Sequence, residues 1–450
     1  MAVIELDLHA PPAPAPTRPP IHLLRPLGLA LTVVLLLTLG GAAPITPSLW
    51  RPLGMVPLGD DDSRYELSGD RLYILDSQVG TRREVSSWSL DLMRRDWTFA
   101  TGAPTTDGVY SRANLASVNG VLLLQSELFV TSVLDPGTGA VLWTTPGWPA
   151  PLGGGRGLIQ ESHFRPGTEY DLKSGDAGEL FWSSSGQPHI EPPLSTSLSG
   201  VDIRTGKRIW TAESPGSVFT APVDDGSGVL VVAADKLTVL DRDTGRVLRE
   251  QAMPRRAGDD YVAWVDVVGE VLLVRRGPSD QVGTVVAYAT DTLAKRWEAE
   301  DPADQAYNGD CTGLPCLKGP AGLTVLNPRT GQAAWRVGRD ARLVQRGDAV
   351  LQVQPSLDQP VRMRDPATGA SLVELTHWNG TPAAGESDQP LVVSRIEPAR
   401  QSTVFGVLPL GGTKVQPLGY AGAIMIECSA NDRYVACRVP GGIEVWAYRA

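Results

Sequence analysis

A ten-residue pattern recurs along this chain, and it constrains the fold more than any other feature. Its most complete copy is LDPGTGAVLW at residues 134–143. Four further clear copies are VDIRTGKRIW at 201–210, LDRDTGRVLR at 240–249, LNPRTGQAAW at 326–335 and RDPATGASLV at 364–373. Two decayed copies are WSLDLMRRDW at 88–97 and YATDTLAKRW at 288–297. Self-similarity of this kind indicates a repeat fold.

The spacing of the pattern gives the size of the repeated unit. Its last position falls at Trp97, Trp143, Trp210, Arg249, Trp297, Trp335 and Val373, which are separated by 46, 67, 39, 48, 38 and 38 residues. All intervals but the second match the four-stranded blade of a β-propeller. The second interval predicts an insertion of roughly 25 residues within 150–195, which we expect to be an extended surface loop.

The residue types of the pattern suit a hairpin between the third and fourth strands of a blade. The Asp or Asn side chain caps backbone N–H groups two or three residues further on, Thr donates back, and Gly takes the left-handed position of the turn. Met93 and Leu293 replace the Gly where the Asp position has become Ser89 and Ala289. We expect a different turn in these two copies.

The final aromatic residue of the pattern lies on the outgoing strand. Its large flat surface suits the wedge between neighbouring blades, so its expected role is packing. The residues concerned are Trp97, Trp143, Trp210, Trp297 and Trp335.

The combination of an aliphatic strand, Asp-x-x-Thr-Gly and a Trp four residues later resembles the repeats of pyrroloquinoline-quinone-type (PQQ-like) β-propellers. The resemblance covers roughly residues 60–450. It implies an all-β fold with a single propeller. WD40 repeats are the nearest competitor, but no Trp-Asp dipeptide or Gly-His pair occurs in register.

The number of blades depends on how the two chain ends are used. Seven copies of the pattern give seven units, and strand-like stretches remain at 390–418 and from IMIEC at 424–428 to the end. The last stretch supplies three strands, and the segment 48–58 is expected to add the missing outer strand, which removes an exposed edge. We expect eight blades, with seven as the alternative.

An apolar segment near the N-terminus predicts a transmembrane helix over 26–45. No charged residue occurs from Pro26 to Trp50, and the apolar run is just long enough to cross a bilayer. Arg18 and Arg25 precede it, which places the Pro-rich tail 1–25 in the cytoplasm and the propeller 46–450 outside the cell. A cleaved signal peptide is the alternative, although Pro44 would then follow the cleavage site directly.

The four cysteines fall into two close pairs, Cys311 with Cys316 and Cys428 with Cys437. We expect a disulfide within each pair, because Gly313 and Pro315 make a tight loop and a turn separates Cys428 from Cys437. Disulfides agree with an exterior location. A zinc site is the alternative, but these spacings differ from the usual two-residue knuckles.

The sequence offers no catalytic, metal-binding or cofactor-binding motif. Quinone-dependent relatives often use two adjacent cysteines, and this chain has no Cys-Cys dipeptide, so the resemblance implies a cofactor-free member. His163, His189 and His377 follow no ligand spacing, and we expect surface positions for them. The run Asp60–Asp62 lacks the pattern of a calcium loop.

The net charge of −10 comes without a basic stripe, which argues against nucleic acid as a partner. The leading hypothesis is a non-catalytic, membrane-anchored scaffold outside the cell that binds an envelope protein or an extracellular ligand. Cofactor-free relatives with this repeat include scaffolds of envelope protein assembly. The alternative is an extracellular enzyme, either a divergent quinoprotein or a polysaccharide-active propeller.

Overall fold

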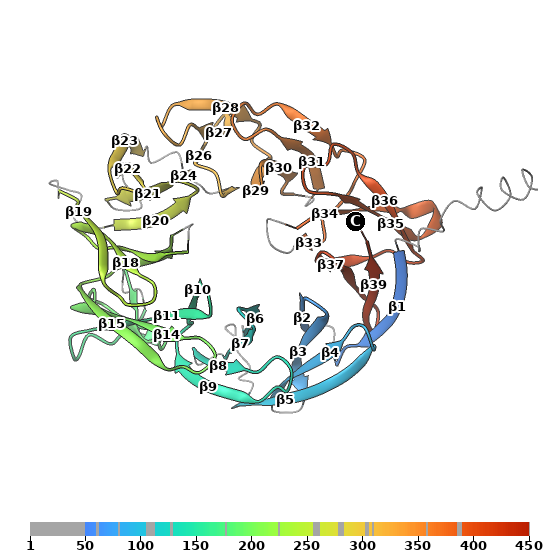
Figure 1. The fold of residues 1–450 in the computed structure, drawn as a ribbon, viewed down its shortest axis with the longest axis horizontal. Coiled ribbons are helices and arrows are strands. Elements are labelled where there is room, and N and C mark those ends of the chain that lie inside the picture. The colour runs from blue at the N-terminus through green and yellow to red at the C-terminus, as the bar shows by residue number, and fades with distance from the viewer. Residues whose placement is uncertain are drawn as a thin grey trace, which may run out of the picture. The chain divides into compact units, whose positions relative to one another are not determined.

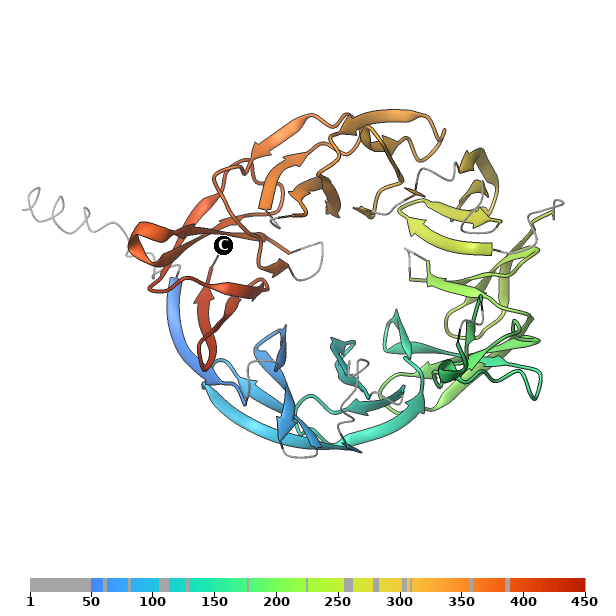
Figure 2. The same ribbon diagram turned by 180° about the vertical axis from the view of Figure 1, so that it is seen from behind.

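The computed structural model describes residues 50–59, 63–79, 82–104, 113–126, 129–175, 178–223, 226–254, 262–277, 283–301, 306–307, 310–356, 359–384 and 389–449. Within these residues the chain forms nine sheets of three to five strands and one two-stranded sheet. The nine larger sheets follow one another in chain order around a ring (Figures 1 and 2). The described residues therefore form a single β-propeller.

The first four blades come from residues 64–252. Blade 1 has β2 (Arg64–Ser68), β3 (Arg71–Val79), β4 (Arg82–Ser89) and β5 (Arg94–Pro104). Blade 2 has β6 (Asn114–Val118), β7 (Val121–Gln125), β8 (Val130–Leu134) and β9 (Val141–Pro146). Blade 3 has β10 (Ala150–Gly153), β11 (Arg156–His163), β14 (Ser195–Asp202) and β15 (Arg208–Pro215). Blade 4 has β16 (Phe219–Pro222), β17 (Gly228–Val232), β18 (Lys236–Asp241) and β19 (Val247–Ala252).

The next three blades extend to residue 374. Blade 5 has β20 (Val262–Val268), β21 (Val271–Arg276), β22 (Gly283–Ala289) and β23 (Lys295–Asp301). Blade 6 has β24 (Ala306–Tyr307), β26 (Cys316–Gly319), β27 (Gly322–Leu326) and β28 (Ala333–Val337). Blade 7 has β25 (Cys311–Thr312), β29 (Arg342–Arg346), β30 (Ala349–Gln354), β31 (Gln359–Arg364) and β32 (Ser371–Glu374).

The last two blades depart from the four-stranded plan. Blade 8 has β34 (Leu391–Glu397), β35 (Ser402–Leu408) and β36 (Gln416–Ala421), and a 3₁₀ turn at Pro398–Arg400 joins the first two. Blade 9 has β33 (Ala383–Ala384), β37 (Ile426–Ala430), β38 (Tyr434–Val439), β39 (Gly442–Tyr448) and β1 (Trp50–Pro57).

The ring closes where the predicted segment pairs with the C-terminal strand. β1 is antiparallel to β39, with Trp50 opposite Tyr448 and Pro57 opposite Gly442. The predicted use of residues 48–58 as an outer strand is confirmed. The predicted blade number is wrong, because both C-terminal stretches form sheets of their own beside the seven copies of the pattern, and the described residues give nine blades.

The ten-residue pattern forms the hairpin that its residue types predict. In blade 2, the Asp135 carboxylate accepts hydrogen bonds from the backbone N–H of Gly137 and Thr138 at 3.0 Å and from the Thr138 hydroxyl at 3.1 Å. Gly139 has φ 70°. A register shift lies at the base of this hairpin, between Val133 and Leu134, and an equivalent shift lies at the base of the hairpin in each of the other six copies.

The two copies without Gly keep the same left-handed backbone, so the prediction of a different turn is wrong. Leu293 has φ 59° and Met93 has φ 45°. The Leu293 N–H donates to the Ala289 carbonyl at 2.9 Å, as the Gly245 N–H does to Asp241 at 2.8 Å. The paired strands on both sides hold the hairpin in this geometry although it costs a side chain roughly 1–2 kcal/mol.

The apolar core is divided among the nine interfaces between successive blades. Each of the nine hydrophobic clusters takes residues from two neighbouring blades. Both faces of a middle strand are therefore buried, which explains continuous apolar runs such as VLLLQ in β7, where Leu122 and Leu123 are fully buried.

The predicted insertion lies between β11 and β14 and is folded, which corrects the expectation of an extended loop. It contains a 3₁₀ turn at Leu172–Ser174 and the two-stranded sheet of β12 (Phe181–Trp182) and β13 (Pro188–His189). His189 is buried within this insertion, with 7% of its surface exposed. Its ring stacks on Phe164 with 3.8 Å between ring centroids, and its Nδ1 lies 2.9 Å from the Thr168 hydroxyl. The predicted surface position of His189 is therefore wrong.

The expected cytoplasmic tail and membrane helix lie in residues 1–49, outside the described residues. Over the part of the chain that the structure describes, no helix has the length and apolar character needed to cross a bilayer.

Candidate functional site

The main candidate site is a cavity of about 720 Å³ on the inner side of blades 7, 8 and 9. β29 and β30 of blade 7, β34 of blade 8 and the start of β37 in blade 9 contribute to its wall, together with the segment 379–382. Its volume lies within the range of roughly 300–1,000 Å³ that is usual for ligand sites.

The cavity lies where blade 8 departs from the four-stranded plan. β34 is the edge strand of a three-stranded sheet, and Gly380 forms an isolated bridge with Ser394 at its inner edge. Of the described residues that follow Gly380, Ala383 and Ala384 do not continue along this edge, because they pair in parallel with Ser429 and Ala430 of blade 9. The inner strand position of blade 8 is therefore only partly filled.

On the blade 7 side of the cavity, a short segment of blade 6 likewise pairs with the neighbouring blade. Cys311 and Thr312 leave blade 6 and pair in parallel with Leu343 and Val344 of β29. Blades 7 and 9 each gain a fifth strand in this way, while blade 8 between them has three.

Hydrogen bonds hold the short segment at the cavity wall in place. The Ser394 N–H donates to the Gly380 carbonyl at 2.9 Å, and the Gly380 N–H donates back to Ser394 at 3.1 Å. The Asn379 side-chain oxygen accepts from the Ile396 N–H at 3.0 Å. The segment at 379–380 is thus anchored along β34 from its central residue, Ser394, to Ile396.

Two arginines of β29 lie in the cavity wall. Arg342 is half-buried, and Arg346 is 8% exposed and donates to the Gln389 carbonyl at 3.0 Å. The acidic side chain in the cavity wall, Glu427, is paired with Arg438 at 2.5 Å. The wall of the cavity thus contains two basic side chains and one acidic side chain among the described residues.

Both predicted disulfides lie at this site. Cys311 bonds to Cys316 and Cys428 bonds to Cys437, so the two predicted pairings are confirmed. The first links the residue that begins β25 to β26, and the second joins directly opposed residues of β37 and β38. Thr312 and Cys428 are in the cavity wall, so each disulfide restrains one side of it.

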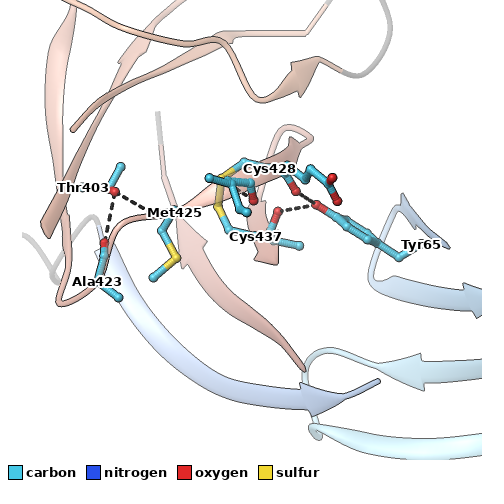
Figure 3. Close-up of a disulfide and its surroundings, with 9 residues drawn as sticks. Tyr65, Thr403, Ala423, Met425, Cys428 and Cys437 are labelled. Carbon is cyan, nitrogen blue, oxygen red and sulfur yellow. Dashed lines mark hydrogen bonds between the residues drawn. A yellow bond between two sulfur atoms is a disulfide. The ribbon is translucent and has the colours of Figure 1, made fainter. Parts of the chain in front are cut away.

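The surroundings of the second disulfide connect the cavity to the ring closure (Figure 3). Thr403 of β35 accepts from the Met425 N–H at 2.9 Å and donates to the Ala423 carbonyl at 3.1 Å. On the other side, the Tyr65 hydroxyl of blade 1 contacts the Glu427 carbonyl and lies 3.0 Å from the Ala436 carbonyl. Burial raises the pKa of Tyr65, so this phenol stays neutral.

The predicted packing tryptophans are not among the residues that line this cavity, and they form a separate system. Trp97, Trp143, Trp210 and Trp335 each donate through the indole N–H to a carbonyl of the next blade's turn, at Pro136, Ile203, Arg242 and Pro366. Trp297 does the same to Pro328.

The remaining sequence candidates do not converge on the cavity. His163 is exposed and lies 2.8 Å from the Ser197 hydroxyl, and His377 is exposed beside β32. Asp60, Asp61 and Asp62 lie outside the described residues. Among the residues that are described, no three His, Cys, Asp or Glu side chains form a group able to hold a metal ion.

Sequence reasoning missed Arg342, Arg346, Asn379 and Ser394. The one available signal was the stretch 376–389, where the repeat predicts an inner strand but the sequence THWNGTPAAGESDQ is polar and rich in turn residues. The signal indicates an irregular blade, but it gives no information on the arginines that face the gap.

One known protein family is similar to part of the chain. The family described as outer membrane protein assembly factor BamB matches residues 195–380. No curated protein sequence matches the chain.

Several solved structures are similar at low identity. BamB from Moraxella catarrhalis is 14% identical, with 89% of this chain and 98% of that chain covered and a TM-score of 0.38. A europium-containing methanol dehydrogenase is 14% identical, with 87% and 85% covered and a TM-score of 0.37. Sqt1 of Saccharomyces cerevisiae is 9% identical, with 80% and 97% covered and a TM-score of 0.43.

Proposed function

This chain carries PQQ-like β-propeller repeats, and from that premise we propose that it is a non-catalytic, membrane-anchored scaffold outside the cell that binds part of another protein. The observation that carries the proposal is the cavity at blades 7–9, where the edge strand β34 adjoins a wall of mixed polar and apolar side chains. Edge strands of this kind are templates for pairing with another chain.

The location rests on the sequence and on the disulfides. The uncharged segment after Pro26 suits an anchor, and Arg18 and Arg25 before it favour a cytoplasmic N-terminus. Two disulfides in the described part of the chain support an oxidising compartment. Fold similarity to a BamB-type family agrees with a protein-binding role but does not name a partner.

Binding is tested by site-specific photocrosslinking in intact cells. A benzophenone amino acid is placed at Thr312 or Gln345 in the cavity wall, or at the exposed Asp340 as control. We expect a discrete cross-linked protein from the cavity positions alone. A pattern that is the same at all three positions, or no product from the cavity, would contradict the proposal.

Anchoring is tested on the same cells. The full chain should stay in the membrane fraction after an alkaline wash, and a chain lacking residues 1–45 should not. Protease added to the outside should digest the propeller. A mature protein whose N-terminus begins after Ala43 would show that the segment is a cleaved signal and would overturn the anchor.

A further inference from the structure

We propose that the Cys428–Cys437 disulfide is a site of thiol–disulfide exchange that a protein dithiol reaches through the cavity, and that its reduction releases the part of the cavity wall formed by residues 425–428. The inference goes beyond the proposed function and does not depend on it, because it needs only the disulfide and the cavity. It follows from the unequal burial of the two cysteines and from the backbone beside Cys428.

The two cysteines of this disulfide differ in their access to solvent. Cys428 is half-buried and lies in the cavity wall. Cys437, directly opposite on β38, is completely buried in the core between blades 8 and 9. A thiolate that enters the cavity can therefore approach Cys428 but not Cys437, and access decides which sulfur of a disulfide is attacked.

Exchange at Cys428 balances in atoms and electrons. One thiolate of the dithiol attacks Cys428 Sγ, the bond to Cys437 breaks, and its electron pair stays on Cys437 Sγ, which takes up a proton. The second thiolate of the dithiol then attacks the dithiol's own sulfur in the mixed disulfide and releases Cys428, which is protonated in turn. The chain gains two electrons and two protons, and the dithiol leaves as a disulfide.

The backbone beside Cys428 is the irregular part of β37. The pairing of β37 with β38 shifts register between Ile426 and Cys428, and Glu427 between them has φ 46°, a left-handed conformation that is unfavourable for a residue with a side chain. These three residues lie in the cavity wall together with Met425. The disulfide ties this segment to β38, so its reduction allows the segment to relax.

The same segment makes backbone contacts with both neighbouring blades (Figure 3). The Glu427 carbonyl accepts a hydrogen bond from the Tyr65 hydroxyl of blade 1. The Met425 N–H donates to the Thr403 hydroxyl of blade 8 at 2.9 Å. Relaxation of residues 425–428 therefore changes the cavity wall at the junction of three blades.

The other disulfide of the chain provides an internal control. Cys311 is 7% exposed and Cys316 is fully buried, and neither is among the described residues that line the cavity. Since reactivity requires access, this disulfide should resist reduction until the protein unfolds.

The first experiment treats the folded, full-length protein in detergent with reduced thioredoxin as the protein dithiol. Acid stops the exchange, the protein is unfolded and alkylated, and mass spectrometry identifies the labelled cysteines, buried ones included. Cys428 and Cys437 should be labelled at least about tenfold faster than Cys311 and Cys316. Equal rates for the two pairs, or no label before the protein unfolds, would overturn the inference.

Two matched variants identify the sulfur that is attacked. Cys437→Ser leaves Cys428 as a thiol and Cys428→Ser leaves Cys437, so both variants lose the same disulfide. In the folded proteins, Cys428 should react with an aromatic disulfide that releases a coloured thiolate at least about tenfold faster than Cys437. Equal rates would contradict attack from the cavity. The first experiment uses the unaltered chain and decides the inference if a variant does not fold.

Release of the wall is tested by hydrogen–deuterium exchange of the oxidised protein and of the protein reduced at Cys428 and Cys437. Amide exchange should increase at residues 425–428 and stay the same in β18 of blade 4. Unchanged exchange at residues 425–428 would show that the disulfide does not hold the wall and would overturn that part of the inference. None of these results depends on whether the cavity positions cross-link a partner in cells, so the proposed function stands or fails separately.

Discussion

The indole of Trp297 in blade 5 lies directly over Gly331 of blade 6. A Cβ atom on Gly331 would be 2.6 Å from the indole, and the Trp297 N–H donates to the Pro328 carbonyl at 3.0 Å. Four other pairs have the same contact: Trp97 with Gly139, Trp143 with Gly206, Trp210 with Gly245, and Trp335 with Gly369. Within one copy of the pattern, the Gly therefore contacts the preceding blade and the Trp contacts the next blade.

Gly331→Ala should destabilise the propeller through two effects. The residue has φ 70°, which disfavours any side chain, and the new methyl group would overlap the Trp297 ring. Overpacking of this kind costs about 1–3 kcal/mol beyond the backbone strain. Urea unfolding followed by tryptophan fluorescence measures the loss.

Gly269→Ala is the matched control for this variant. Gly269 also has positive φ, at 54°, but a Cβ there would meet no atom within 4 Å. It should cost only the backbone strain, about 1 kcal/mol. Equal losses in the two variants would show that the contact with Trp297 has no energetic role.

Where the Gly is missing, the Trp of the preceding blade is missing as well. Arg249 stands at the Trp position before Leu293, and Leu293 is fully buried in the core between blades 4 and 5. At the ring closure, a Cβ atom on Gly54 of β1 would lie 3.4 Å from the Met93 side chain. In both places the space between the two blades is occupied by the side chain at the Gly position of the turn, Leu293 or Met93, instead of by a Trp.

Restoring the pair should therefore show strong coupling. Arg249→Trp alone places an indole against Leu293, and Leu293→Gly alone leaves a cavity, so both single variants should be destabilised. The double variant should recover much of the loss, with a coupling of about 0.5–3 kcal/mol in a double-mutant cycle. If the stability losses of the two single variants, measured from urea midpoints, simply added in the double variant, the idea that Leu293 replaces a Trp–Gly pair would be contradicted.

Removing the Cys311–Cys316 disulfide should loosen the blade 7 side of the cavity. Cys311→Ala with Cys316→Ala should lower stability by about 2 kcal/mol, the value expected for a short closed loop. Thermal unfolding with and without dithiothreitol measures it. The reductant should affect the double variant less than the wild type, since only Cys428–Cys437 remains; an unchanged response would mean that the first disulfide contributes nothing.

The turns should make the propeller sensitive to acid. Hydrogen bonds from Thr205, Thr244 and Thr368 lower the pKa of Asp202, Asp241 and Asp365, respectively. Because these carboxyls bind protons less readily when folded, their contribution is complete above their ordinary pKa and is lost as pH falls through the lowered values.

Replacing all three aspartates by Asn should reduce this pH dependence while stability at pH 7 changes little. Asn327 already holds the same turn in blade 6, accepting from the Arg329 N–H at 2.9 Å. Urea midpoints at pH 7 and pH 3 should differ less in the triple variant than in the wild type. Asp340→Asn, an exposed position outside the turns, is the control and should behave like the wild type.

The sequence alone determined the repeat, its hairpin and the two disulfides. These features depend on residues close together in the chain: Asp135 bonds to Thr138, three residues away, and Cys428 opposes Cys437 across one hairpin. Local hydrogen bonds and strand alternation leave a readable pattern, so the fold class and the use of residues 48–58 followed as well.

Only the tertiary structure decided the blade number, the fold of the insertion and the cavity. Closing the ring depends on the pairing of Trp50 with Tyr448 and on the angles between successive blades, which add up around the ring. No short segment of the sequence determines these angles. Likewise, the cavity between Arg342 and β34 forms because residues 383–384 pair with blade 9 instead of completing blade 8. Contacts between residues far apart in the sequence decide whether residues 383–384 pair with blade 8 or with blade 9. Such contacts cannot be predicted from the local sequence.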